Sequence, residues 1–176
     1  MLGRRYAAND KKKGVPPMRK LLLILLLPTL VLAAQAPLFQ LEDTSGNDVK
    51  LSDYLGENVV LLDFWATSCA PCLAVMPHIQ ELHEKYEDDG LKVIGISEDL
   101  PRNLSSVKAK ARELGVTYTI VLDKNAAALQ AYQGGDTGIP FIVIIDSSGA
   151  ICETFRRIQP GDEDKIESAV RDALGL

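Results

Sequence analysis

Short apolar segments alternate with amphipathic segments along most of the chain. Residues 59–65 are apolar apart from Asp63, and residues 91–97 form a second apolar run. Such runs are typical of strands buried on both faces of a sheet. Between them, the spacing of apolar residues from Cys69 to about Asp88 predicts a helix. The same reasoning predicts a helix at residues 103–114, a short strand at 119–122 and a short helix at 126–132. It also predicts a strand hairpin at 141–155 and a final helix at 161–174.

Two hairpins frame this alternation. Residues 39–51 alternate around Thr44-Ser45-Gly46-Asn47, and residues 141–155 around Asp146-Ser147-Ser148-Gly149. The order of elements predicts an α/β fold in which a mixed central sheet is covered by helices on both faces. The helix that begins near Cys69 would start at the carboxyl end of a central strand, where open α/β sheets place their sites.

The charge is unevenly distributed and separates the N-terminus from the rest. Seven basic residues and one acidic residue precede Leu21, a net charge of +6, and because the whole chain carries −5, the remainder carries −11. An acidic domain without a basic patch argues against a nucleic-acid partner. The length and the 47% hydrophobic content suit one domain with a sizeable core.

The basic N-terminus resembles an export signal. Met18-Arg19-Lys20 and the apolar run at residues 21–34 supply its charged and hydrophobic regions, and Ala34-Gln35-Ala36 resembles a cleavage site. The run is shorter than the ~20 residues of a spanning helix and contains Pro28, which favours a signal peptide over a permanent anchor. We therefore expect a basic extension at 1–17 (or a true start at Met18), a signal peptide or anchor at 18–36, and a domain at 37–176 beyond the membrane.

Candidate chemistry centres on two cysteines. Cys69 and Cys72 fall in the first turn of the predicted helix, where free N–H groups and the helix dipole favour a thiolate. Their spacing places both on one face and allows a disulfide, so we predict reversible dithiol/disulfide exchange. A metal half-site or a structural disulfide is the alternative. Zinc needs four ligands, however, and His78 and His83 are five residues apart and do not face the same way.

Asp63 interrupts an otherwise apolar strand. Burial would raise the pKa of its carboxyl group and let the carboxylate accept the proton of Cys72 through a water. The alternative is a structural side chain that finds a hydrogen-bond partner at the edge of the sheet. Cys152, in the last hairpin, is most simply a small packed hydrophobic residue.

The motifs together resemble the thioredoxin superfamily, and more closely its TlpA/ResA-like branch of thiol-disulfide oxidoreductases, which is related to the AhpC/TSA redoxins. The resemblance covers nearly all of residues 37–176. It rests on the segments Pro37-Leu38-Phe39, Leu51-Ser52-Asp53-Tyr54-Leu55-Gly56, Leu61 to Thr67, Cys69-Ala70-Pro71-Cys72, Pro77 and Gly138-Ile139-Pro140. It implies a thioredoxin-like three-layer fold with an N-terminal hairpin, and an inserted strand and helix between Leu91 and the Gly138 loop.

The resemblance also implies site roles. Cys69 would be the attacking thiolate, Cys72 the buried resolving thiol and Asp63 the proton acceptor. Pro140 would follow a cis peptide bond and face the CxxC motif. The residues expected to contact substrate are Trp65, Ser68, Pro71, Ile139 and Pro140, although Trp65 also fits a place in the core.

Two positions depart from the family pattern. Ser68 stands where tryptophan usually precedes the first cysteine, which removes a flat surface beside the reactive sulfur. Val75 stands where many ResA-like proteins carry glutamate, so a specific role in cytochrome c maturation is not carried over.

These features predict an exported thiol-disulfide oxidoreductase that reduces protein disulfides in the periplasm or on the extracytoplasmic face of the membrane. No cofactor is expected, because no GxGxxG motif follows a strand and nothing indicates a flavin or nicotinamide site. The substrates would be exported disulfide-containing proteins, and a membrane or exported reductant would supply electrons. An uncleaved leader would contact the membrane.

Two other functions are open. One is a thiol peroxidase of the AhpC/TSA type, although Ala66 and Leu62 occupy the places where that chemistry needs threonine and proline. The other is a copper chaperone or copper-binding module, for which a CxxC motif with a distant histidine could suffice.

Overall fold

The computed structural model describes residues 34–136, 138–159 and 161–176. The predicted basic extension and almost all of the leader lie outside these ranges. Among the described helices, none combines the length and apolar character needed to cross a membrane.

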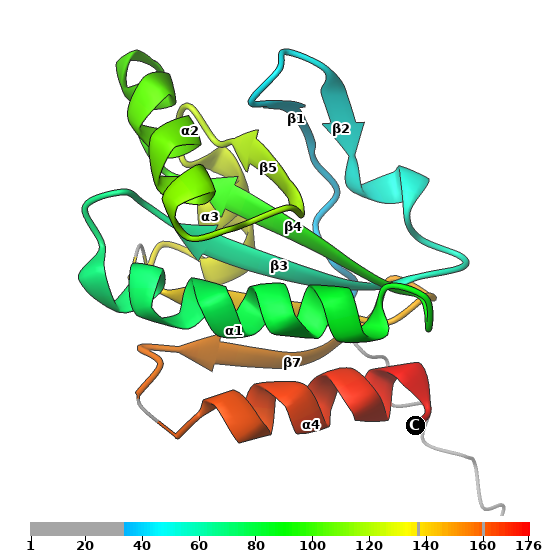
Figure 1. The fold of residues 1–176 in the computed structure, drawn as a ribbon. Helices are drawn as coiled ribbons and strands as arrows, with labels where there is room; N and C mark the ends of the chain where they lie inside the picture. The colour runs from blue at the N-terminus through cyan, green and yellow to red at the C-terminus, as the bar shows by residue number, and fades with distance from the viewer. Residues whose placement is uncertain (1–33, 137, 160) are drawn as a thin grey trace, which may run out of the picture. The chain divides into compact units, whose positions relative to one another are not determined.

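The described residues form one seven-stranded mixed sheet (Figure 1). Its strands are β1 (Gln40–Asp43), β2 (Asp48–Lys50), β3 (Val59–Trp65), β4 (Leu91–Ser97), β5 (Thr119–Leu122), β6 (Phe141–Ile145) and β7 (Ile151–Arg156), in the spatial order β2-β1-β5-β4-β3-β6-β7. Strands β3, β4 and β5 are parallel to one another, whereas the two hairpins pair antiparallel at the sides. The α/β architecture predicted from the sequence is confirmed.

Helices cover both faces of the sheet. They are α1 (Ala70–Tyr86), α2 (Leu104–Glu113), α3 (Ala127–Gln133) and α4 (Glu163–Leu174). One apolar cluster joins α1, α2 and α4 to one face of the sheet, and a second joins α3 and the N-terminal segment to the other. Alternate residues of β3 supply the two clusters, because successive side chains of a strand point to opposite faces. This explains why β3 is buried along its whole length.

Helix starts differ in detail from the sequence prediction. Asn103 precedes α2, but it ends a short 3₁₀ turn (Pro101–Asn103) and its side chain makes no capping hydrogen bond. Asn103 therefore occupies the N-cap position of α2 without a side-chain cap. The final helix begins at Glu163, two residues after Gly161.

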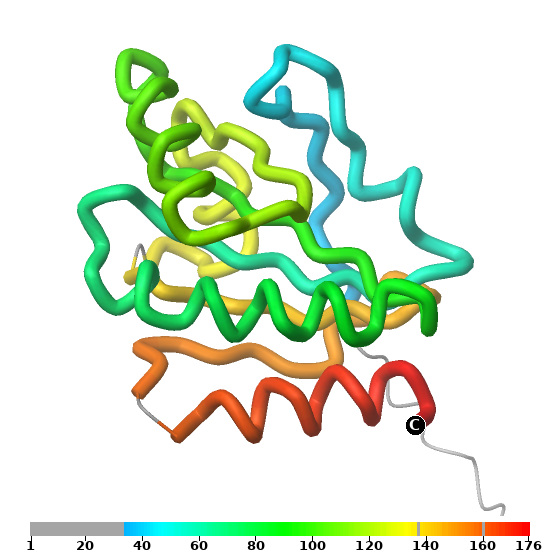
Figure 2. The backbone as a smooth tube through the Cα atoms, in the orientation of Figure 1, coloured from blue at the N-terminus to red at the C-terminus, as the bar shows by residue number. Residues whose placement is uncertain are grey.

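The loop from β3 into α1 lies at the same end of the sheet as the loop that leads into β6 (Figure 2). The register explains this, since Phe64 near the end of β3 pairs with Phe141 at the start of β6. The two cysteines and Pro140, far apart in the sequence, thus come to one end of the central strands.

Candidate dithiol site

Cys69 and Cys72 form a disulfide whose Cα atoms are 5.3 Å apart. Cys69 occupies the N-cap position of α1, and the backbone N–H of Cys72 donates to its Sγ at 3.2 Å. Cys69 is half-buried, while Cys72 is fully buried beneath it. A helix N-terminus directs N–H groups at the outer sulfur, and such donors favour its thiolate.

Asp99 holds the loop between β3 and the disulfide. Its Oδ2 accepts the backbone N–H of Thr67 at 2.8 Å, and its Oδ1 accepts the Thr67 hydroxyl at 2.6 Å. The backbone N–H of Glu98 also donates to the carbonyl of Trp65 at 2.8 Å. Sequence reasoning missed Asp99. The available signal was a carboxylate two residues after a buried parallel strand, at the edge where β3 also ends.

We expect Asp99→Ala to lower the free energy of unfolding at pH 6 by about 2–3 kcal/mol, because Thr67 then loses the acceptor of both its N–H and its hydroxyl. Denaturant titration measures the change. Asp48→Ala, which removes an exposed acid bonded to Gln40, is the matched control and should cost less than about 1 kcal/mol. Equal losses for the two variants would show that Asp99 does not hold this loop.

Asp63 is fully buried on the face of β3 that α1 covers. Its neighbours on that face, Leu61 and Trp65, belong to the same apolar cluster as Cys72. Neither carboxylate oxygen has a hydrogen-bond partner among the described residues. Burial raises the pKa of Asp63 to about 7. Because β3 lies between β4 and β6, Asp63 is not at the sheet edge where the alternative placed its partner, and the group is able to exchange a proton near neutral pH.

The Ile139–Pro140 peptide bond is cis, as the resemblance implied. Gln133, at the end of α3, donates from Nε2 to the carbonyl of Gly138 at 2.9 Å. On the other side, the N–H of Arg157 donates to the carbonyl of Pro140 at 3.3 Å. Sequence reasoning missed both supports, because each joins this loop to a residue placed there only by the folded sheet.

The residues expected to contact substrate differ in exposure. Ser68 and Pro71 are exposed beside the disulfide, and Ile139 is half-buried. Trp65 has no exposed surface, so its proposed substrate contact is wrong and its side chain belongs to the core. Pro140 is also buried, which leaves the backbone of Ile139 as the part of that loop available to an extended peptide.

Cys152 is exposed on the outer strand β7, so the prediction that it is a small packed hydrophobic residue is wrong. Strand β7 has a neighbour on only one side in the sheet, and its central residues, Cys152 to Thr154, are exposed. In the described ranges, no three His, Cys, Asp or Glu side chains are arranged to hold a metal ion.

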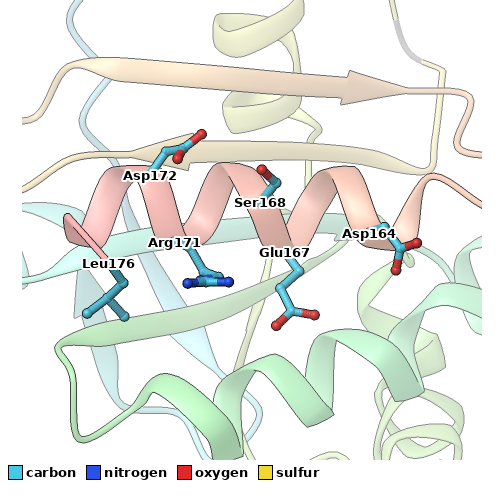
Figure 3. A pocket seen from close by; sticks show the side chains of 6 residues that line it. All are labelled: Asp164, Glu167, Ser168, Arg171, Asp172 and Leu176. Atoms are coloured by element: carbon cyan, nitrogen blue, oxygen red, sulfur yellow. The ribbon is translucent and has the colours of Figure 1, made fainter.

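A hollow of about 440 Å³ runs along α4, away from the cysteines. Figure 3 shows its lining residues, Asp164, Glu167, Ser168, Arg171, Asp172 and Leu176. Glu167 accepts bonds from Lys85 and the Tyr86 hydroxyl at 2.7 and 2.6 Å, which joins α4 to α1. None of these lining residues belongs to the dithiol site.

The fold and the site define a thioredoxin-like protein with a redox-active dithiol/disulfide pair at the start of a helix. The sequence profile of the AhpC/TSA family matches residues 32–154, and the chain belongs to this family.

Relatives support the same class. The chain is 31% identical to thiol-disulfide oxidoreductase ResA of Geobacillus thermodenitrificans, across 80% of this chain and 87% of that protein. It is 36% identical to ResA of Geobacillus kaustophilus, where the match spans 66% of this chain and 64% of the relative. A crystal structure assigned as thiol:disulfide interchange protein DsbE of Chlorobium tepidum superposes with a TM-score of 0.74 at 29% identity, covering 81% of this chain and 97% of that one. The predicted oxidoreductase class and redox dithiol function are confirmed.

Proposed function

We propose that the protein reduces disulfides of exported proteins on the extracytoplasmic side of a membrane, with Cys69 as nucleophile and Cys72 as resolving thiol. The observation that carries this proposal is the asymmetry of the pair, in which the outer sulfur lies at a helix N-terminus and the inner one is fully buried. Only Cys69 is placed to meet a protein substrate.

The reaction has two exchange steps. The Cys69 thiolate attacks a substrate disulfide, forms a mixed disulfide and releases one substrate thiolate. Cys72 then gives its proton to the Asp63 carboxylate, and the Cys72 thiolate attacks Cys69 Sγ. The second substrate thiolate leaves, and the Cys69–Cys72 disulfide remains. Two electrons have passed to the substrate, and an external dithiol must restore the pair.

The surroundings of the substrate surface suit an extended peptide. Ser68 and Pro71, next to the cysteines in the sequence, are exposed, and the half-buried Ile139 packs against the same apolar cluster as Cys69. The small Ser68 side chain leaves room beside the attacking sulfur. The predicted leader at 18–36 would deliver the domain across the membrane, and would tether it there if uncleaved.

The reduction potential tests the direction of the reaction. The two residues between the cysteines, Ala70 and Pro71, carry no positive charge. A thiolate with little extra stabilisation favours the disulfide form and makes a reductant, so equilibration with defined thiol buffers should give a value near about −270 mV. A value near about −120 mV would make the protein an oxidant and contradict the proposal.

A further inference from the structure

A group of buried polar atoms lies on the face of the sheet covered by α1, where Trp65 and Tyr118 belong to the same apolar cluster as Cys72. Its members are both Asp63 carboxylate oxygens, Trp65 Nε1 and the Tyr118 hydroxyl. Each is buried and has no hydrogen-bond partner among the described residues. Buried polar groups in native proteins are almost always satisfied, directly or through water. Several unpaired polar atoms on the face of the sheet that also holds Cys72 therefore call for a functional explanation.

The packing of the sheet explains why these groups meet. In the parallel ladder, Asp63 pairs with Gly95 of β4. A Cβ placed on Gly95 would lie 3.0 Å from Tyr118 Cε2 and 3.3 Å from Trp65 Nε1. The absence of a side chain at Gly95 thus lets the ring of Tyr118, which precedes β5, lie over the strand residue beside Asp63.

Tyr118 and Trp65 can only donate to this carboxylate. The indole has a single N–H and no acceptor, and burial together with the negative charge of Asp63 raises the pKa of Tyr118 well above its usual value. The tyrosine therefore keeps its proton while Asp63 is ionised. Two neutral donors beside a buried carboxylate are the arrangement that stabilises its charged form.

We propose that Tyr118 is a positioning residue whose hydroxyl, together with the Trp65 indole N–H, donates to the Asp63 carboxylate through a bridging water. This inference rests on the proposed function, in which that carboxylate accepts the proton of Cys72. By stabilising the carboxylate, Tyr118 sets the pH above which the resolving step is fast.

Few other titratable groups face Asp63. From α1 the Cys72 sulfur lies on this side, and His83 packs edge-on against Tyr118 with ring centroids 6.1 Å apart. His83 pairs with Glu87 at 3.5 Å. The residues beside Asp63 on β4 and β6, Gly95 and Ile142, do not titrate. Tyr118 is therefore the group through which the pKa of Asp63 is best tested.

The test uses the fluorescence of Trp65, the only tryptophan of the chain. Because the pKa of Asp63 is raised to about 7, the Trp65 emission of the oxidised protein should change with pH around a midpoint near 7. The Asp63→Asn variant should show no such transition. Tyr118→Phe should move the midpoint upward by about one pH unit, the effect of losing one charge-assisted hydrogen bond. In the pH profile of the disulfide-reduction rate, the rise on the acidic side should move upward by the same amount.

Tyr132→Phe is the matched control. The Tyr132 hydroxyl donates to the carbonyl of Pro37 at 2.9 Å, and its ring packs on Phe64 in the opposite cluster. Its loss should leave the midpoint unchanged. A midpoint in Tyr118→Phe equal to that of Tyr132→Phe and the wild type overturns the inference.

A second measurement needs no variant of Tyr118. The ¹³Cζ resonance of Tyr118 in the wild-type oxidised protein should shift with the same midpoint as Trp65 emission and stay flat in Asp63→Asn. A flat resonance in the wild type overturns the inference. Because both titrations use oxidised protein without substrate, they separate failure of the inference from failure of the proposed reductase activity, which the rate assay alone reports.

Discussion

Replacing Cys72 with alanine should abolish reductase turnover and leave Cys69 covalently joined to its substrates. The second exchange step needs the buried Cys72 thiolate to attack Cys69 Sγ, and no other described cysteine lies near the pair. We expect the rate of disulfide reduction to fall by at least about 10³-fold, since catalysis by the intact dithiol stops after one half-reaction. In the native host, Cys72→Ala should accumulate adducts that disappear on treatment with a reductant.

The exposed Cys152 requires a control in this experiment, because it could form adducts of its own. Cys72→Ala combined with Cys152→Ser should retain the adducts, whereas Cys69→Ala combined with Cys72→Ala should lose them. Adducts that follow Cys152, or a Cys72→Ala protein that binds no exported protein, would contradict the proposed exchange mechanism.

Replacing Asp63 with asparagine should have the second largest effect, on both rate and stability. Burial raises the pKa of this carboxyl to about 7, so in the wild type the resolving step should accelerate as pH rises through 7 and the carboxylate forms. An asparagine cannot accept the proton. At pH 7.5 we expect turnover to fall by about 10²-fold. The increase in rate around pH 7, which we call the limb near pH 7, should be absent from the pH profile of the variant.

The effect on stability has the opposite sign. In the unfolded chain Asp63 ionises above its ordinary value of 3.8, whereas in the folded protein it keeps its proton up to about 7. The unfolded state therefore binds fewer protons between these values, and the free energy of unfolding falls as pH rises through that window, by about 4 kcal/mol. Asparagine removes this loss but buries an amide, so at pH 8 we expect Asp63→Asn to be more stable by about 1–3 kcal/mol.

Glu98 provides the control for this assignment. Its pKa is raised to about 8 by burial and by the nearby Asp123 and Asp99. Glu98→Gln should leave the limb near pH 7 in place. If that limb disappears in Glu98→Gln and persists in Asp63→Asn, Asp63 is not the proton acceptor.

The sequence by itself determined much of the fold and the reactive pair. The positions and lengths of the apolar runs predicted β3, β4 and β5 with the bounds that the structure shows. The reason is that strands buried on both faces are apolar throughout. The spacing of Cys69 and Cys72 required only one turn of helix to bring the sulfurs together. Asp63 was identifiable for a related reason, since a single carboxylate within a strand buried on both faces must itself be buried.

The tertiary structure decided everything that depends on contacts between distant segments. Asp99 reaches Thr67, Gln133 reaches Gly138 and Tyr118 lies over Gly95 only because parallel strands in a fixed register bring their ends together. Burial was likewise beyond the local pattern. Trp65 is fully buried and Cys152 is exposed, because exposure is set by which element covers each face of the sheet. The chain thus encodes its dithiol locally, but the groups that support the site come from residues brought to it by the sheet.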